Sequence, residues 1–265
     1  MHLKKAVIGG FLLTSTCAFP NHDGNDAQGL PYLHPRLRTI RSNTGASISF
    51  TEAGKAGICE TTPGVKRYSG YINLSRDAHM FFMFFEARQD PHNAPTTLWL
   101  GGGPGSDSLN AAFKGKPTEN LTEYWTTQAA AKVDWDAVQA FYGALPKLNP
   151  RLKSRHFNLW TVSNGGHYGP TFFRYFYDQN TKIINGKLRG QPLAFDALGI
   201  INGAIDTGIE QTGDLACARS LEDVEYILDL PVRVTLMYGD ADFVSNWLGG
   251  EAVSLAANYS NAAAF

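Results

Sequence analysis

The sequence predicts an α/β fold whose mostly parallel sheet is flanked by helices. Short apolar runs alternate with helix-like segments along the chain. Three of these runs end in unusual turns: Gly-Gly-Gly-Pro-Gly at 101–105, Ser163 in Val-Ser-Asn-Gly-Gly, and Asp242 in Gly-Asp-Ala-Asp. Parallel strands end at a common sheet edge, where such folds carry their sites. We therefore expect the three turns to lie together.

Length and composition fit one folded domain. The chain has 265 residues, 43% of them hydrophobic, which is ample for a buried core. Its 23 basic and 24 acidic residues nearly balance, for a net charge of −1. No basic patch stands out, which argues against nucleic acid as the main partner.

The N-terminus has the features of an export signal. Lys4 and Lys5 precede an apolar run at 6–13, and small residues at Thr16 and Ala18 suit cleavage before Phe19. The alternative is a buried N-terminal helix. No other segment approaches the roughly 18 apolar residues of a membrane span.

We accordingly divide the chain into three parts. Residues 1–18 are expected to be a signal peptide, 19–45 a leader or flexible segment, and 46–265 the folded domain. Export predicts a secreted, extracellular or vacuolar protein.

Cysteines and glycosylation sequons agree with export. Cys59 and Cys217 remain after signal removal and could form one disulfide, or could be two unrelated buried thiols. Three Asn-x-Ser/Thr sequons offer candidate glycosylation sites at Asn73, Asn120 and Asn258.

The remaining elements follow from hydrophobic patterning. Expected strands are 47–51, 68–74, 79–88 (buried on both faces), 96–100, 156–162, a stretch within 193–205, and 232–238. Expected helices are 129–145, a helix from the Ser163 turn to about 180, 221–228 and 248–257. Pro146 should end the first helix, and Ser220 should open the third as part of a capping box.

The turn at Ser163 has the pattern of a nucleophile elbow, a serine between a strand and a helix. The glycine cluster could offer backbone N–H groups to an oxyanion. A serine hydroxyl also needs a base, and the last histidine is His167, which we expect to pack within the core. Asp240 and Asp242 could instead be a metal pair, but no ligand cluster accompanies them, so we expect no metal and no cofactor.

Four blocks resemble the serine carboxypeptidases of peptidase family S10, particularly the fungal secreted type. They are the stretch from Cys59 through Tyr71, the stretch from Phe84 through Gly105, Ser-Asn-Gly-Gly-His-Tyr-Gly-Pro at 163–170, and Gly-Asp-Ala-Asp-Phe-Val-Ser-Asn-Trp at 239–247. The resemblance implies an α/β-hydrolase fold and a Ser-Asp-His triad working at acid pH. It further implies release of C-terminal residues from a peptide or protein substrate through an acyl-enzyme.

By position, Ser163 matches the family's nucleophile and Asp242 the residue that orients its base. The backbone N–H groups of Gly103 and Asn164 match the oxyanion hole. Three further positions, Gly101, Gly102 and Val162, match the substrate-binding segment. Two of them depart from the family, which usually has asparagine at the position of Gly101 and glutamate at that of Val162, the groups that bind the substrate's terminal carboxylate.

Other departures concern whole segments. Polar sequence at 106–128 replaces a family strand, the cap insertion expected between Asp206 and Thr212 is absent, and no histidine follows Asp242. We therefore expect a shortened domain, incomplete at its C-terminus. Two alternatives stay open: an inactive or truncated relative that lacks the triad histidine, and an esterase or acyltransferase on the same scaffold.

Overall fold

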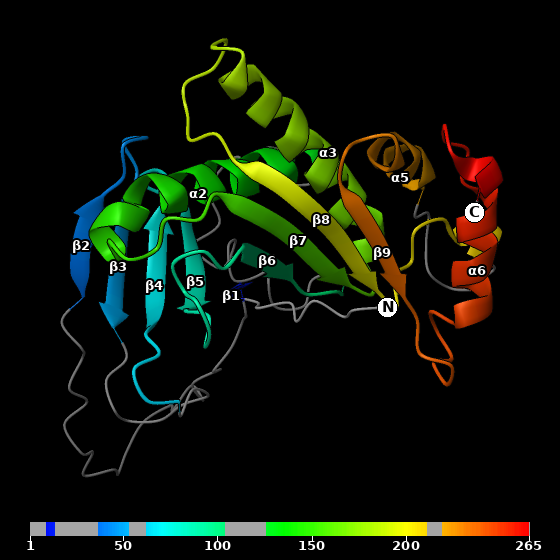
Figure 1. Ribbon diagram of the computed structural model, residues 1–265, viewed down its shortest axis with the longest axis horizontal. Coiled ribbons are helices and arrows are strands. Elements are labelled where there is room, and N and C mark those ends of the chain that lie inside the picture. Colours follow the sequence, from blue (N-terminus) through cyan, green and yellow to red (C-terminus); the bar gives the residue numbers. More distant parts are fainter. Residues whose placement is uncertain (1–8, 14–36, 53–61, 104–125, 211–218, 265) are drawn as a thin grey trace, which may run out of the picture.

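The computed structural model describes residues 9–13, 37–52, 62–103, 126–210 and 219–264, which build a nine-stranded sheet with helices (Figure 1). The strand order is β2-β3-β4-β5-β1-β6-β7-β8-β9. The strands are β1 Gly9–Leu13, β2 Arg38–Arg41, β3 Ser47–Glu52, β4 Arg67–Asn73, β5 His79–Phe85, β6 Thr96–Leu100, β7 His156–Val162, β8 Ala194–Ile201 and β9 Arg233–Met237. The helices are α2 Thr127–Leu148, α3 Gly165–Ile184, α4 Thr207–Glu210, α5 Leu221–Leu228, α6 Trp247–Ala256 and the short η2 Ala262–Ala264.

The sheet has an antiparallel half and a parallel half. Strands β2 to β5 pair antiparallel in sequence order. Strands β6 to β9 are all parallel, as expected for the strands that precede the three motifs. The α/β-hydrolase fold class is confirmed, but the sheet is half parallel rather than mostly parallel, because β2 to β5 and the β5–β1 pair run antiparallel. The parallel half carries the expected site residues, and β1 joins the two halves.

Two strands lie in regions where no sheet strand was expected. Strand β2, Arg38–Arg41, falls within 19–45, the expected leader or flexible segment, so these four residues have regular structure. They pair with β3 residue by residue, from Arg38 with Phe50 to Arg41 with Ser47. Strand β1, Gly9–Leu13, falls within the expected signal peptide and lies in the middle of the sheet.

A helical layer covers one face of the sheet. Helix α2 packs on β2, β3 and β4, α3 packs on β7 and β8, and α5 packs on β9, while α3 contacts both of the other two. Aromatic rings fill the space between layers: Phe141 of α2 lies 5.2 Å from Phe84, centroid to centroid, and Phe173 of α3 lies 5.2 Å from Phe195. None of the helices in the described part of the chain is long and apolar enough to cross a membrane.

Two local expectations about β5 and α2 are corrected by the structure. Residues 79–85 alternate between buried and half-buried rather than being buried on both faces, because the helical layer covers only one of them. Pro146 lies inside α2, which continues to Leu148. It lies one turn before the helix end, where its missing N–H removes only one intrahelical bond, and the N–H of Asn149 still closes the helix on the carbonyl of Leu145, at 2.8 Å.

The expected capping box at α5 is also wrong. Ser220 is the N-cap of this helix, but its side chain makes no capping hydrogen bond. The Ser220 hydroxyl instead donates to the backbone carbonyl of His167 and lies 3.2 Å from the Nδ1 atom of that residue. This serine therefore ties α5 to the beginning of α3.

One buried carboxylate anchors the end of α2 to β5. Glu86 follows β5 and is buried, and it accepts from both the Asn149 amide and the Arg151 guanidinium, the latter at 3.1 and 3.2 Å. The backbone N–H of Lys66 donates to the same carboxylate at 3.0 Å. A buried charge this well hydrogen-bonded holds its neighbours in one geometry.

A second buried carboxylate, that of Asp134, is less well hydrogen-bonded. Asp134 of α2 is 3% exposed, and among the described residues its Oδ2 atom has no hydrogen-bond partner. Burial away from water disfavours the charged form and raises the pKa of this carboxyl to about 7. The folded state therefore binds a proton here that the unfolded chain releases near pH 4.

We predict that Asp134 makes the fold more stable in acid. Its contribution is complete below the unfolded pKa and is lost as pH rises through about 7. Asp134→Asn should therefore remove most of the fall in stability across this range, at most about 4 kcal/mol. Urea unfolding at pH 5 and pH 8 measures this.

The matched control is Asp136→Asn on the exposed side of the same helix, where Asp136 pairs with Lys132 at 3.3 Å. That variant should leave the pH dependence unchanged. Equal pH profiles for the parent and Asp134→Asn would contradict the assignment.

Candidate active site

The carboxyl ends of four parallel strands bring the expected site residues to one edge of the sheet. Gly101 follows β6, Ser163 follows β7, Asn202 follows β8, and Asp242 lies in the turn after β9. The register aligns these ends, since Leu100 is opposite Thr161, Val162 opposite Ile201, and Ile201 opposite Met237. The strand pairing therefore confirms the prediction that the three motifs lie at one edge of the sheet.

Ser163 adopts a left-handed backbone conformation, with φ of 58°. Such a conformation is strained in a residue with a side chain and persists only where surrounding bonds impose it. The Ser163 N–H donates to the carbonyl of Ile201 at 2.9 Å, and its own carbonyl accepts from Gly166 and Ala204 at 2.9 and 3.0 Å. Asn164 then occupies the N-cap position of α3 without a side-chain capping bond, so the serine lies on a tight strand-to-helix turn.

The turn is tight because two glycines let α3 approach its neighbours. A methyl group on Gly166 would lie 2.6 Å from the backbone nitrogen of Ala204. One on Gly165 would lie 2.5 Å from Cβ of Thr161, whose hydroxyl donates to the Gly165 carbonyl at 2.9 Å. These close approaches explain the Gly-Gly pair after the serine in physical terms.

The glycine cluster lies directly against the serine. A methyl group on Gly102 would be 2.7 Å from Cβ of Ser163, 3.2 Å from its Oγ and 2.8 Å from the carbonyl oxygen of Val162. The Tyr168 hydroxyl of α3 donates to the carbonyl of Gly101, which ties the cluster to the helix. Gly103 has a φ of 135°, a conformation that favours glycine.

Asp242 is held by three hydrogen bonds. Its Oδ1 accepts from the backbone N–H groups of Val244 and Ser245, each at 2.8 Å. Its Oδ2 accepts from the side-chain amide of Asn202 at 2.8 Å. The carboxylate is therefore fixed relative to the end of β8, the strand whose last residue, Ile201, bonds to Ser163.

Asn202 is a site residue that the sequence analysis missed. It has a left-handed φ of 44°, and its N–H donates to the carbonyl of Met237 at 2.7 Å. Among the described residues only Asp90, Ser163 and Asn202 combine a side chain with positive φ, and two of these three lie at this edge. An Asn-Gly pair directly after a buried strand was the available signal.

The described histidines lie away from Ser163 or are bonded elsewhere. His92 and His156 precede β6 and β7, at the opposite end of these strands. The ring of His167 lies 3.4 Å from the Thr127 hydroxyl and 3.2 Å from that of Ser220, and burial lowers its pKa despite nearby Asp223. His167 therefore links α2, α3 and α5, in agreement with the structural role expected from the sequence.

The structure describes two of the three predicted glycosylation sites and neither cysteine of the predicted disulfide. The side-chain amide of Asn73 donates to Ser47 and Ser49 on the neighbouring strand, at 3.3 and 3.2 Å. Asn258 is exposed after α6. Cys59, Cys217 and Asn120 lie outside the described residues.

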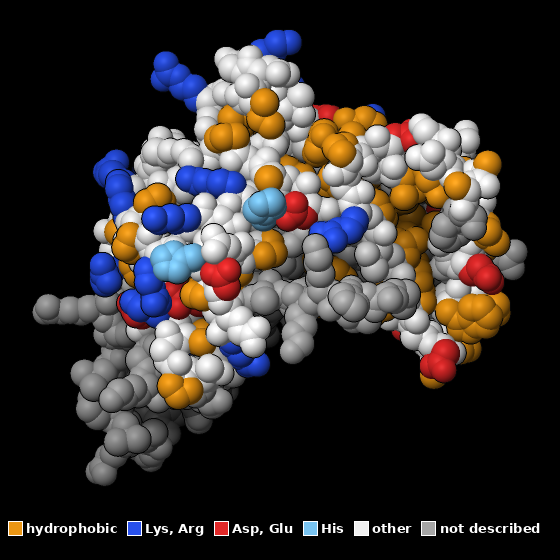
Figure 2. Space-filling model, in the orientation of Figure 1, with side chains coloured by type: hydrophobic (Ala, Val, Ile, Leu, Met, Phe, Trp, Pro, Cys, Tyr) orange, Lys and Arg blue, Asp and Glu red, His pale blue; other side chains and the backbone are white. Residues whose placement is uncertain are grey.

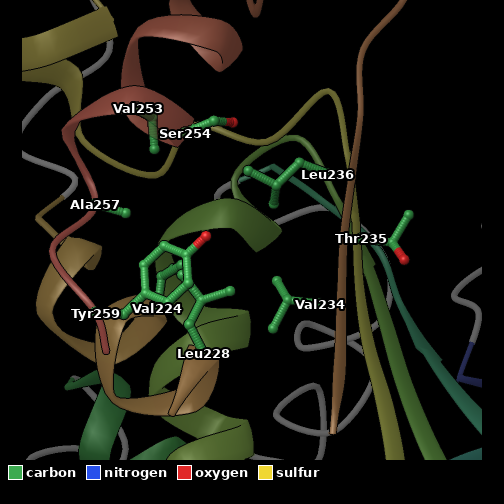
Figure 3. A pocket seen from close by; sticks show the side chains of 9 residues that line it. All are labelled: Val224, Leu228, Val234, Thr235, Leu236, Val253, Ser254, Ala257 and Tyr259. Atoms are coloured by element: carbon green, nitrogen blue, oxygen red, sulfur yellow. The ribbon is translucent and has the colours of Figure 1, made fainter. Parts of the chain in front are cut away.

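A separate cavity of about 390 Å³ lies at the far edge of the sheet, between α5, β9 and α6 (Figure 3). Apolar side chains dominate its walls, and none of the sequence-predicted site residues lines it: the lining is Val224, Leu228, Val234, Thr235, Leu236, Val253, Ser254, Ala257 and Tyr259. Figure 2 shows this apolar hollow on the right of the molecule. Near Asp242, four large apolar side chains are exposed: Phe243, Val244, Trp247 and Leu248.

We predict that the space at Gly102 controls the position of Ser163. Gly102→Ala places a methyl group in contact with the serine and with the Val162 carbonyl, so the turn must shift. We expect a loss of about 1–3 kcal/mol in unfolding free energy, measured by urea denaturation. Gly239→Ala is the control, since its methyl group would meet only Asn202, at 3.7 Å; equal effects of the two changes would contradict the prediction.

A second prediction separates the two roles of Asn202. Asn202→Gly keeps the left-handed backbone and removes the amide, so it should lower stability by about 1 kcal/mol. Asn202→Ala also removes the amide but replaces asparagine by a residue that tolerates left-handed backbone less well, which should raise the total loss to about 2–3 kcal/mol. Thermal unfolding of both variants measures the difference, and equal losses would show that the backbone conformation carries no strain.

Comparison with known proteins agrees with the geometry of this edge. Residues 57–117, which include the glycine cluster, match the family model described as serine carboxypeptidase. Carboxypeptidase S1 from Penicillium janthinellum is 38% identical over 217 residues, covering 69% of this chain and 50% of that protein. Carboxypeptidase Y homolog A from Aspergillus clavatus is 48% identical over 171 residues, covering 53% of this chain and 31% of that protein.

A further relative is carboxypeptidase S1 homolog A from Trichophyton rubrum, 27% identical over 286 residues, with 74% of this chain and 43% of that protein covered. The chain thus spans half or less of the length of these relatives. The family model and the 38% identity to carboxypeptidase S1 over 69% of this chain show the family. The chain is a relative of the fungal serine carboxypeptidases.

Proposed function

We propose that this protein is a serine-type carboxypeptidase that hydrolyses C-terminal residues from peptides through an acyl-enzyme on Ser163. The observation that carries the proposal is the elbow: a strained serine at a strand end, directly against a glycine cluster. Acyl transfer needs a nucleophile beside backbone N–H donors, and the contact of Ser163 with the glycine cluster supports such an arrangement. The names of the fungal relatives support the same reaction class.

In the proposed reaction, the Ser163 oxygen attacks the scissile carbonyl carbon while the carbonyl oxygen becomes negative. The backbone N–H groups of Gly103 and Asn164 are the proposed donors to that oxygen. Asn164 is well suited because it begins α3, where N–H groups lack intrahelical partners. Substrate would pass along Gly101, Gly102 and Val162.

Asp242 is the proposed orienting carboxylate for the imidazole that takes the serine proton. Its Oδ1 is occupied by two backbone donors and its Oδ2 by one amide, which leaves acceptor capacity on Oδ2 for an imidazole N–H. Among the described histidines none fills this role. The ring of His79 bonds to Asn73 and the Arg76 carbonyl, and that of His167 contacts Thr127 and Ser220, while His92 and His156 lie at the opposite end of β6 and β7.

A second candidate function is ester hydrolysis on the same scaffold. It is favoured by Gly101 and Val162, which offer no polar side chain to a substrate's terminal carboxylate. A site without that recognition would accept acyl groups whose leaving group carries no charge.

The proposal includes export. Residues 1–18 would act as the signal, and the chain would reach an extracellular or vacuolar compartment. A disulfide between Cys59 and Cys217 and glycans on Asn120 or Asn258 would follow there. Asn73 is the least favourable of the three sequons, because its amide already binds two hydroxyls of the adjacent strand.

The test is labelling with a fluorophosphonate, which reacts with an activated serine. We expect the label on Ser163, found by peptide mass spectrometry, and none on Ser163→Ala; Ser260→Ala, at an exposed position after α6, should label as the parent does. Peptide turnover by Ser163→Ala should fall by at least about 10³-fold.

Substrates then separate the two candidates. Cleavage of N-blocked dipeptides at acid pH supports the carboxypeptidase, whereas labelling with cleavage of short esters alone would replace it by the esterase. A parent chain that takes no label, beside a full-length fungal relative that does, would refute both.

A further inference from the structure

An N-terminal strand is inserted between two strands of the sheet that follow each other in the sequence. Strands β5 and β6 are consecutive in the chain between residues 79 and 100, yet they are not neighbours in the sheet. Strand β1, Gly9–Leu13, lies between them. It pairs antiparallel with β5, where Phe11 is opposite Phe84, and parallel with β6, where Phe11 is opposite Leu98.

The walls of this position are held apart by elements other than β1. Two adjacent residues of α2 contact the two halves of the sheet: Phe141 packs on Phe82 and Phe84 of β5, and Tyr142 packs on Phe157 of β7. Since β6 pairs with β7 along its whole length, α2 fixes β5 and β6 relative to each other. A gap one strand wide therefore exists in the fold whichever segment fills it.

An empty gap would expose two rows of backbone donors and acceptors. Neighbouring strands lie about 4.8 Å apart, so β5 and β6, two spacings apart, cannot pair directly. Unpaired strand edges of this kind pair with extended segments. One extended segment lying between β5 and β6 would satisfy the backbone N–H and C=O groups of both strands.

The occupant is also the apolar core of the expected export signal. Cleavage after Ala18 would remove all of β1 from the chain. The uncleaved chain can therefore complete its own sheet, whereas a cleaved chain presents the gap.

We propose that the gap between β5 and β6 is a strand-binding site for an extended apolar peptide that runs parallel to β6. In the uncleaved chain Gly9–Leu13 occupies this site, and removal of residues 1–18 opens it to the same segment supplied as a separate peptide. Recognition comes from backbone hydrogen bonds to both walls, with the register of Phe11 between Phe84 and Leu98.

The experiment starts from the folded full-length chain, produced without export so that its N-terminus is intact. Residues 22–28 are replaced by a site for a sequence-specific protease, and the chain is cut only after folding. We expect the N-terminal fragment to stay bound on size exclusion and to be displaced by excess fluorescent peptide of residues 6–16.

The matched control peptide carries Phe11→Pro, which has no backbone N–H at that position. It should compete about tenfold less well or worse. Hydrogen exchange supplies an independent readout: amides of β5 and β6 should be slow while the fragment is bound and faster once it is removed.

Two results would overturn the proposal. One is release of the fragment on cutting with no change in hydrogen exchange of β5 and β6. The other, measured on the intact chain so that it does not depend on cutting, is exchange of the amides of residues 10–13 as fast as in an unstructured peptide.

Discussion

The parallel pairing of β6, β7 and β8 is the constraint on which the rest of the site depends. Because these strands end together, the N–H of Ser163 meets the carbonyl of Ile201, and this bond helps hold the serine in its left-handed conformation. The same alignment places Gly102 against the serine and Asn202 beside Asp242. A shift of one residue in either pairing would reverse the face of each strand and separate these groups.

The helical layer connects this edge to the rest of the molecule. His167 of α3 contacts Thr127 at the start of α2 and Ser220 at the start of α5. The first turns of three helices are therefore joined next to the turn that holds Ser163. On α2, burial raises the pKa of Asp134 to about 7, so this carboxyl favours the folded state at low pH.

The sequence predicted the sheet strands after residue 46 and the shared edge of three motifs, because alternating apolar runs and glycine-rich turns are local signals. It missed Asn202, whose role requires knowing that β8 ends beside Asp242. It assigned Ser220 to a local cap, whereas the hydroxyl bonds to His167, 53 residues away. Strand β1 could not be predicted either, since its partners are separated from it by more than 70 residues and its apolar run also fits an export signal.

The most direct measurement of the central claim is a crystal structure of the chain reacted with a phosphonate. We predict a phosphorus atom bonded to Oγ of Ser163, with one phosphonyl oxygen within hydrogen-bond distance of the N–H groups of both Gly103 and Asn164. A phosphonate on another side chain, or an adduct on Ser163 whose oxygen is turned away from both amides, would contradict it.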